Sequence, residues 1–317
     1  MYQSRSLLEG VIRSISKGEL LDILRVQTTV LSVMEDFMVS RGFVQLMPVI
    51  TAKVTDPLGP DPNASVVEKP KIRYQGEELV LTQSMILHKQ LALLTGAERI
   101  FVMSPNVRLE DPSKGGGGKH LFEFTQMDFE VKDGTMDVVM SLIEDLLIEL
   151  VSRVSSERWK ELERLGRVLE VPSKPFKAYT SHELEEKYGT DWERAASLDQ
   201  RHPFWVTCFK REFYDREDPG SPGHYRNYDL IYPEGYGEGA SGGEREWQYE
   251  RLVARIREGG IEPSEYEAYL TVARMGLLFP SAGAGIGVER LVRFLVGARH
   301  IGDIQPFRRV PGESVLL

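Results

Sequence analysis

The sequence predicts an α+β fold in which a largely antiparallel β-sheet is flanked by helices. Short strand-like segments follow one another in hairpin-like pairs, and segments with helical periodicity stand among them without regular βαβ alternation. The 317 residues, 41% of them hydrophobic, are enough to bury one large core. We therefore expect residues 1–317 to form a single domain.

The expected elements follow from apolar spacing and from the residues that end each segment. Gly42 fits the end of one helix, and Ser84 can cap the start of another. Helices are predicted over 19–41, 84–95, 136–154 and 288–296, after a short helical lead-in at 1–18. Strands are predicted over 43–50, 78–82, 107–110, 122–131, 228–232, 241–247 and 282–286.

Composition narrows the kind of protein. The formal net charge is −9, which lowers the expectation that a large nucleic acid is the main substrate. The one cysteine cannot form an internal disulfide, and we see neither a membrane span nor a secretion signal, so a cytoplasmic location is predicted. Residues 155–222 are charged and irregular, and we expect them to form an insertion on one edge of the sheet.

The strands around the glycine loop carry the first candidate site. Residues two apart on a strand share a face, so Arg108 lies beside Glu110, and Phe124 lies beside Gln126 and Asp128. A solvent-facing sheet would also alternate polar residues. A phenylalanine on that polar face, however, needs a cover, and a nucleobase offers a flat one.

A second candidate is the segment SAGAGIGVERL, residues 281–291. Gly285 and Gly287 allow a ligand to approach the backbone closely, and Arg290 follows in the first turn of a helix, where an anion would favour it. The spacing is GxGxG rather than GxGxxG, and no βαβ unit follows, so we reject a dinucleotide fingerprint. A tight packing turn remains an alternative reading.

Two further segments carry charged residues in turn-like contexts. Asp229 and Glu238 flank a turn and could hold Mg²⁺, which takes one or two carboxylates together with phosphate oxygens. Arg245 follows a glycine pair and could bind a carboxylate through both nitrogens. Ser84 and Lys89 bracket about one and a half helical turns, where a lysine is most often solvated. A glycine-rich surface loop is the alternative for residues 228–246.

Together and in this order, these segments resemble the catalytic core of class II aminoacyl-tRNA synthetases. The helix and strand that end at Pro48 are similar to motif 1, VRLE with HLFEFTQMDFE to motif 2, and GIGVERL to motif 3. The pieces LTQS, HKQ and SGGER resemble the aspartyl/asparaginyl subgroup. The resemblance covers about 20–150 and 225–310, and implies an antiparallel sheet and a homodimer.

The resemblance also implies which residues handle ATP and metal. Arg108 would hold the α-phosphate and the reacting carboxylate, and Phe124 and Arg290 would enclose the adenine. Arg108, Arg290 and Glu238 would be catalytic, and Glu238 with Asp229 would carry Mg²⁺. The positions implied for ATP are Arg108, Glu110, His120, Phe124, Glu238, Gly285, Gly287 and Arg290.

The amino-acid substrate is implied by a second set. Lys89 and Arg245 would face its side chain, and two cations suit aspartate better than asparagine. Ser84 and Asp128 would hold its α-amino end. Ile86 stands where aspartyl enzymes carry a substrate-contacting glutamine, so we expect aspartate to be held differently here, with its second carboxylate toward ATP.

The expected reaction follows from what precedes the motif 1 helix. Only about twenty residues do, so no anticodon-binding domain is expected, and archaeal asparagine synthetases related to asparaginyl-tRNA synthetase resemble this pattern. The leading hypothesis is that aspartate, ATP and ammonia give asparagine, AMP and pyrophosphate through β-aspartyl-adenylate, with tRNA an improbable partner. The alternatives are a paralogue that aminoacylates tRNA or a protein, and an inactive binding module.

Overall fold

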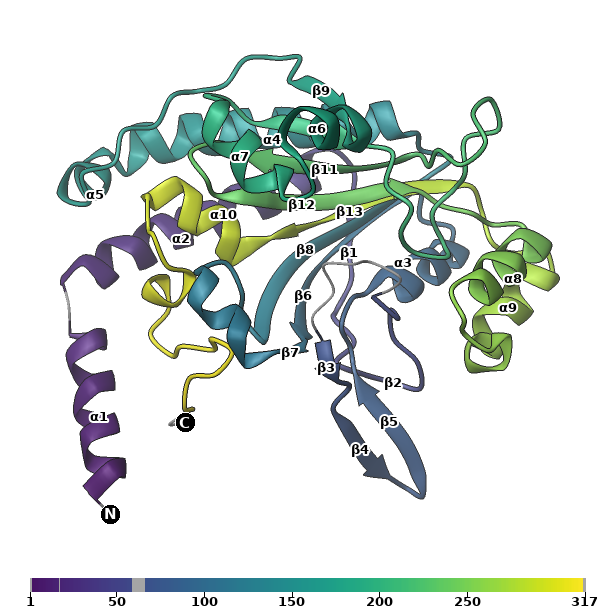
Figure 1. The fold of residues 1–317 in the computed structure, drawn as a ribbon, viewed down its shortest axis with the longest axis horizontal. Coiled ribbons are helices and arrows are strands. Elements are labelled where there is room, and N and C mark those ends of the chain that lie inside the picture. The colour runs from purple at the N-terminus through teal and green to yellow at the C-terminus, as the bar shows by residue number, and fades with distance from the viewer. Residues whose placement is uncertain (1, 17, 59–65, 316–317) are drawn as a thin grey trace.

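The computed structural model describes residues 2–16, 18–58 and 66–315 (Figure 1). Among these residues, eight strands form one sheet in the order β1-β6-β8-β13-β12-β11-β10-β9. The strands are β1 (Val44–Gln45), β6 (Arg99–Val107), β8 (Glu123–Lys132), β9 (Lys177–Thr180), β10 (Phe204–Thr207), β11 (Asn227–Tyr232), β12 (Gly237–Glu244) and β13 (Ser281–Gly287). The outer pairs β1–β6 and β9–β10 are parallel and the inner pairs are antiparallel, so the predicted fold class is confirmed.

Helices and the inner strands share one large apolar core. These helices are α2 (Gly18–Ser40), α4 (Met136–Glu157), α5 (Trp159–Arg164) and α10 (Val288–Val296). Val26 of α2, Leu147 of α4 and Leu291 of α10 belong to one buried cluster with Phe129 of β8. The apolar residues of each helix recur every three or four positions, which turns one stripe toward the sheet. Helix α1 (Tyr2–Ile15) extends away from this body in Figure 1.

A second apolar cluster supports the other side of the site. It joins Leu87 of α3 (Ile86–Ala92), Leu252 of α8 (Tyr249–Glu258) and Leu270 of α9 (Glu267–Arg274). Smaller sheets complete the fold: β2 (Thr51–Ala52), β5 (Glu77–Leu81) and β4 (Lys71–Tyr74) in one, β3 (Val66–Glu68) and β7 (Leu109–Glu110) in the other. Met85 occupies the N-cap position of α3, and the Ser84 hydroxyl instead accepts a hydrogen bond from the Ile86 amide at 3.2 Å.

Two sequence predictions need correction. The strand predicted over 107–110 is divided in the structure: Val107 ends the long strand β6, and Leu109–Glu110 form the short strand β7. Strand β6 begins at Arg99 and pairs with β8 from Arg99↔Val131 to Val107↔Glu123. Its Pro105 weakens the strand signal, because proline cannot donate to a ladder. The segment 155–222 does lie at the sheet edge, but it is not irregular: it contains α5, β9, α6 (Ser181–Tyr188), α7 (Trp192–Asp199) and β10.

Within the part of the chain that the structure describes, the helices are all too short or too polar to cross a membrane.

Gly283 allows the closest approach between β13 and β8. A Cβ atom there would lie 2.1 Å from the Phe129 carbonyl oxygen and 2.2 Å from Glu130 Oε2. We predict that Gly283→Ala lowers the free energy of unfolding by about 1–3 kcal/mol, because these backbone and buried atoms must move. Urea denaturation would measure it. Gly116→Ala is the matched control, since its Cβ would meet no atom within 4 Å; equal losses in both variants would contradict the prediction.

Candidate active site

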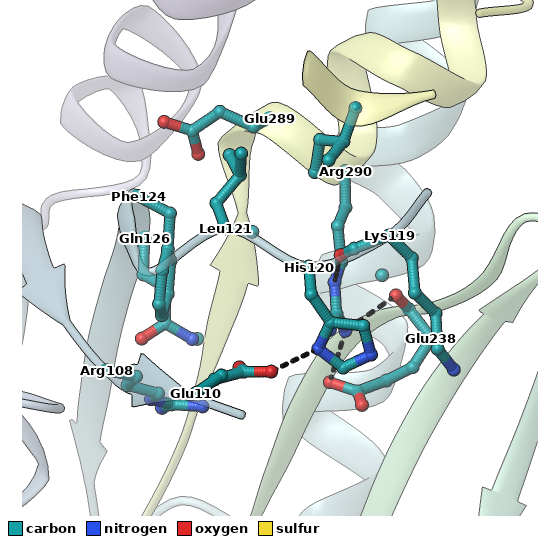
Figure 2. Close-up of a pocket in the computed structure, with 14 residues that line it drawn as sticks. Arg108, Glu110, Lys119, His120, Leu121, Phe124, Gln126, Glu238, Glu289 and Arg290 are labelled. Atoms are coloured by element: carbon teal, nitrogen blue, oxygen red, sulfur yellow. Dashed lines mark hydrogen bonds and ion pairs between the residues drawn. The ribbon is translucent and has the colours of Figure 1, made fainter. Parts of the chain in front are cut away.

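Two adjoining cavities lie at the centre of the sheet. The first, of about 550 Å³, is shown in Figure 2, and the second has a volume of about 700 Å³. All eight positions implied for ATP line the first cavity: Arg108, Glu110, His120, Phe124, Glu238, Gly285, Gly287 and Arg290. All four positions implied for the amino acid, Ser84, Lys89, Asp128 and Arg245, line the second. Arg108, Gln126, Glu238 and Gly285 line both, so they mark the junction.

Arg108 is held at this junction by its neighbours. Its Nε donates a hydrogen bond to the Gln83 carbonyl oxygen at 3.0 Å, and its guanidinium carbon lies 5.1 Å from the centre of the Phe124 ring. Among the described residues, Arg108 forms no ion pair. Its charge is therefore available to an anionic ligand that reaches the junction.

Arg290 and Glu238 form an ion pair in the lining of the first cavity. The Arg290 guanidinium comes from the first turn of α10 and lies 3.3 Å from Glu238 Oε1, while it donates to the Lys119 and Glu238 carbonyl oxygens (Figure 2). Burial raises the pKa of Glu238, but the cations Arg290, Lys119, Arg211 and Arg108 outweigh it, and the net pKa lies below the ordinary value. The Glu238 side chain is thus ionised, and it can bind a cation or a metal ion that is held by phosphate.

Asp229, the second expected metal ligand, is paired with an arginine. Both of its carboxylate oxygens accept hydrogen bonds from Arg211 Nη1, at 2.8 and 3.0 Å. Burial raises the pKa of Asp229 to about 7, against the attraction of Arg211. Its side chain lines neither of these two cavities. Among the described residues, no cluster of three or more His, Cys, Asp or Glu side chains is arranged to hold a metal; Glu238 lines the first cavity, and Asp229 is engaged with Arg211.

His120 and Glu110 are brought into direct contact. His120 Nδ1 lies 2.5 Å from Glu110 Oε2 above the floor of the first cavity (Figure 2). The two residues are implied for different parts of ATP, the triphosphate and the adenine.

The second cavity is built on a buried chain of charges. Lys89, only 2% exposed, lies 3.2 Å from Asp128 Oδ1 and 3.6 Å from Glu130 Oε2. Arg245 Nε lies 3.1 Å from Glu130 Oε1, and its Nη1 lies 3.8 Å from Asp215 Oδ1. Lys89 is therefore not the solvated surface lysine that its helix position favours. Buried charges are tolerated when they are paired in this way.

Sequence reasoning missed one wall of the second cavity. This wall is formed by Asp56, Leu58, Arg211, Glu212, Tyr214 and Asp215. Most of these residues belong to the segment 155–222, which was expected to be an insertion. The sequence signal that could have identified this wall is the run KREFYDRED, in which charged residues stand among aromatic ones. Asp56, although 158 positions away in the sequence, accepts a hydrogen bond from the Tyr214 hydroxyl at 2.8 Å.

The same segment also supports the first cavity. Glu193 of α7 accepts hydrogen bonds from Lys119 Nζ at 2.7 Å and from the Glu238 amide at 3.1 Å. The edge segment thus braces the strand that carries Glu238.

The fold and this site define a class II synthetase catalytic core. Residues 5–311 match the family of class II tRNA synthetases of the D, K and N group, and the chain belongs to that family. Within it the chain matches the aspartyl/asparaginyl subgroup, as its motifs predicted.

The relatives specify this further. The chain is 28% identical to an asparagine–tRNA ligase of Thermoplasma acidophilum, over 92% of this chain and 70% of that one. It is 30% identical to one of Pyrococcus abyssi (91% and 68%) and 29% to an aspartate–tRNA(Asp/Asn) ligase of Methanothermobacter thermautotrophicus (95% and 70%). Asparaginyl-tRNA synthetase of Pyrococcus horikoshii, solved with asparaginyl-adenylate, matches with a TM-score of 0.83, 28% identity and coverage of 95% and 71%. These relatives give no support to the expectation that tRNA is an improbable partner.

Glu289 generates a pH prediction. Both its oxygens lie 3.0 Å from the Thr125 amide, and burial raises its pKa from 4.5 to about 7. Between about pH 5 and 7 the folded state holds a proton that the unfolded state has lost, so stability from this group declines as pH rises.

We predict that Glu289→Gln removes this decline. The difference in Tm, variant minus wild type, should therefore be larger at pH 8 than at pH 5. Thermal unfolding across that range measures it. Glu185→Gln, an exposed position on α6, is the control. Parallel Tm curves for wild type and Glu289→Gln would refute the assigned pKa.

Proposed function

We propose that this chain is an ATP-dependent ligase that activates aspartate as an acyl-adenylate. The observation that carries the proposal is the guanidinium of Arg108 at the junction of the two cavities, which has no carboxylate partner within the described part of the chain. Adenylation brings a carboxylate against the α-phosphate, and two anions at such a distance repel strongly in a poorly solvated site. A fixed cation between them stabilises the transition state.

Each cavity suits one of the two substrates in this proposal. In the first, Phe124 offers a flat apolar face to the adenine, and Arg290 lies on the opposite side to meet the base and the phosphates. Gly285 and Gly287 leave room for the nucleotide to approach the sheet. Glu238 would hold Mg²⁺, which neutralises charge on the leaving pyrophosphate when it is bound.

The second cavity favours aspartate. Lys89 and Arg245 would receive one carboxylate, and Ser84 and Asp128 the α-amino group. Asp128 Oδ2 is buried and has no hydrogen-bond partner among the described residues, so it can accept from an ammonium group. Ile86 closes the wall with an apolar side chain.

Activation is tested by aspartate-dependent exchange of pyrophosphate into ATP. We expect Arg108→Lys to lower the exchange rate by at least a hundredfold, because a lysine cannot span phosphate and carboxylate with a planar fork. Arg257→Lys, at an exposed position of α8, is the matched control and should keep the wild-type rate. Full exchange in Arg108→Lys would remove Arg108 from the reaction, and wild-type exchange with asparagine but not aspartate would reverse the substrate assignment.

Two acceptors are candidates for the second half-reaction. The names of the relatives, which are tRNA ligases, favour tRNA. Ammonia is favoured by the carboxylates in the wall of the second cavity, Asp56, Glu212 and Asp215, which suit a small cation.

The two acceptors are separated by supplying each to the enzyme with ATP and radiolabelled aspartate. Ammonium as acceptor should yield free asparagine, and tRNA should yield acid-precipitable label. We expect asparagine to form at a rate at least tenfold above the no-enzyme control. Label on tRNA without any asparagine would assign the chain to aminoacylation instead.

A further inference from the structure

We infer that Glu193 of α7 is a positioning residue for ATP, because its carboxylate closes a ring of contacts that fixes two cations of the first cavity, Lys119 and Arg290. The inference rests on the proposed function in one respect, that the first cavity binds ATP. It gives a role in nucleotide binding to the edge segment 155–222, which lies outside the three motifs of the family.

Four residues from separate parts of the chain form this ring. Glu193 Oε1 accepts hydrogen bonds from Lys119 Nζ at 2.7 Å and from the Glu238 amide at 3.1 Å. Arg290 Nη1 donates to the Glu238 carbonyl oxygen at 3.1 Å, and Arg290 Nε donates to the Lys119 carbonyl oxygen at 3.3 Å, which closes the ring. Lys119, Glu238 and Arg290 line the first cavity (Figure 2), whereas Glu193 does not. Glu193 therefore acts on a ligand through the other three residues.

Lys119 depends on Glu193 for its place at the cavity. It follows four consecutive glycines, Gly115 to Gly118, and glycine loses more conformational freedom on ordering than any other residue. Its side chain is 34% exposed, so the ammonium group would sample several rotamers if nothing held it. Within the described part of the chain, Glu193 is the one carboxylate that forms an ion pair with Lys119.

The backbone that leads into Glu238 is shaped by the same helix. Ser197 of α7 is fully buried, and its hydroxyl donates to the Tyr232 carbonyl oxygen at 2.6 Å. The same oxygen accepts from the amides of Gly235 and Gly237, at 3.0 and 3.3 Å. One proton and two lone pairs are the whole hydrogen-bonding capacity of a hydroxyl, so Ser197 is saturated by this turn. Helix α7 thus fixes the path of the chain between β11 and Glu238.

Opening the ring should weaken the binding of ATP and spare the binding of aspartate. A ligand binds more tightly to cations that are already held in place, because less freedom is lost when the complex forms. Lys119 and Arg290 are held in this way by the ring. Lys89 and Arg245 of the second cavity are held instead by Glu130, which has no contact with α7 in the ring.

The first test compares Glu193→Ala with Glu193→Gln, since the glutamine carbonyl oxygen can still accept both hydrogen bonds. Equilibrium dialysis with radiolabelled ATP and Mg²⁺ gives the Kd for ATP, and pyrophosphate exchange gives the KM values for ATP and aspartate. We expect Glu193→Ala to raise both ATP constants about tenfold and the aspartate KM less than about twofold, and Glu193→Gln to stay within about threefold of wild type. Glu185→Ala, at an exposed position of α6, is the control.

Three results would overturn the role of Glu193. These are an unchanged Kd for ATP in Glu193→Ala, an equal rise in the KM values for ATP and aspartate, and a Glu193→Gln variant as weak as Glu193→Ala. The second result would mean that the substitution disturbs the whole site, and the third that the two hydrogen bonds do not position the cations.

A second variant, Gly237→Ala, displaces the Glu193 carboxylate and covers the case in which Glu193→Ala does not fold. A Cβ atom at Gly237 would lie 2.4 Å from Glu193 Oε1, and φ there is +76°. Gly260→Ala is the matched control, because φ is +71° and its Cβ would meet no atom within 4 Å. We expect Gly237→Ala to raise the Kd for ATP about fivefold or more, and Gly260→Ala to leave it unchanged. Equal values of Kd in the two variants would contradict the ring.

Dialysis without aspartate separates this inference from the proposed function. A wild-type protein that binds ATP but shows no aspartate-dependent exchange would overturn aspartate activation, while a weaker Kd in Glu193→Ala would still support the ring. Wild-type exchange together with an unchanged Kd in Glu193→Ala would overturn the ring alone. A wild-type protein that binds no ATP would overturn both.

Discussion

The pairing of Glu130 with Lys89 and Arg245 is the interaction on which the rest of the site depends. Glu130 is fully buried in β8, and Ser281 of β13 donates a further hydrogen bond to it at 2.8 Å. An unpaired charge at this depth would cost several kcal/mol, so the sheet is stable only when α3, β13 and the end of β12 converge on this carboxylate. Gly283 permits the convergence, because a Cβ atom at this position would lie 2.2 Å from Glu130 Oε2. Its carbonyl oxygen also accepts a hydrogen bond from Arg245 Nη2 at 2.8 Å.

This arrangement also creates the two-cavity site. The ion pairs of Lys89 and Arg245 with Glu130 fix the floor of the second cavity. The first cavity stays open beside it because Gly285 and Gly287 have no side chains. Arg108 stands where the two meet and, among the described residues, has no carboxylate partner. The buried cations Lys89 and Arg245 are thus paired with carboxylates, whereas Arg108 is available at the place where two anionic substrates would react.

The edge segment 155–222 changes the character of the second cavity. It supplies Arg211, Glu212, Tyr214 and Asp215 to the lining, and Asp215 Oδ1 lies 3.8 Å from Arg245 Nη1. One side of the cavity can take carboxylates and the other can take cations. The cationic side of the cavity is accounted for by membership of the family, which the chain matches over residues 5–311. The proposal that ammonia is the acceptor rests on the acidic side.

The sequence by itself determined the fold class, the helices α2, α3, α4 and α10, and the twelve positions expected for ATP and the amino acid that line the two cavities. Local signals suffice for these, since strand alternation puts Phe124 and Gln126 on one face, and the order of three motifs identifies a family. Only the tertiary structure decided that Lys89 is buried, that Asp229 is engaged with Arg211, and that β6 is a long inner strand. It also brought Asp56 to Tyr214. Burial and ion pairing between distant segments depend on packing, and no local pattern of residues specifies which charges meet there.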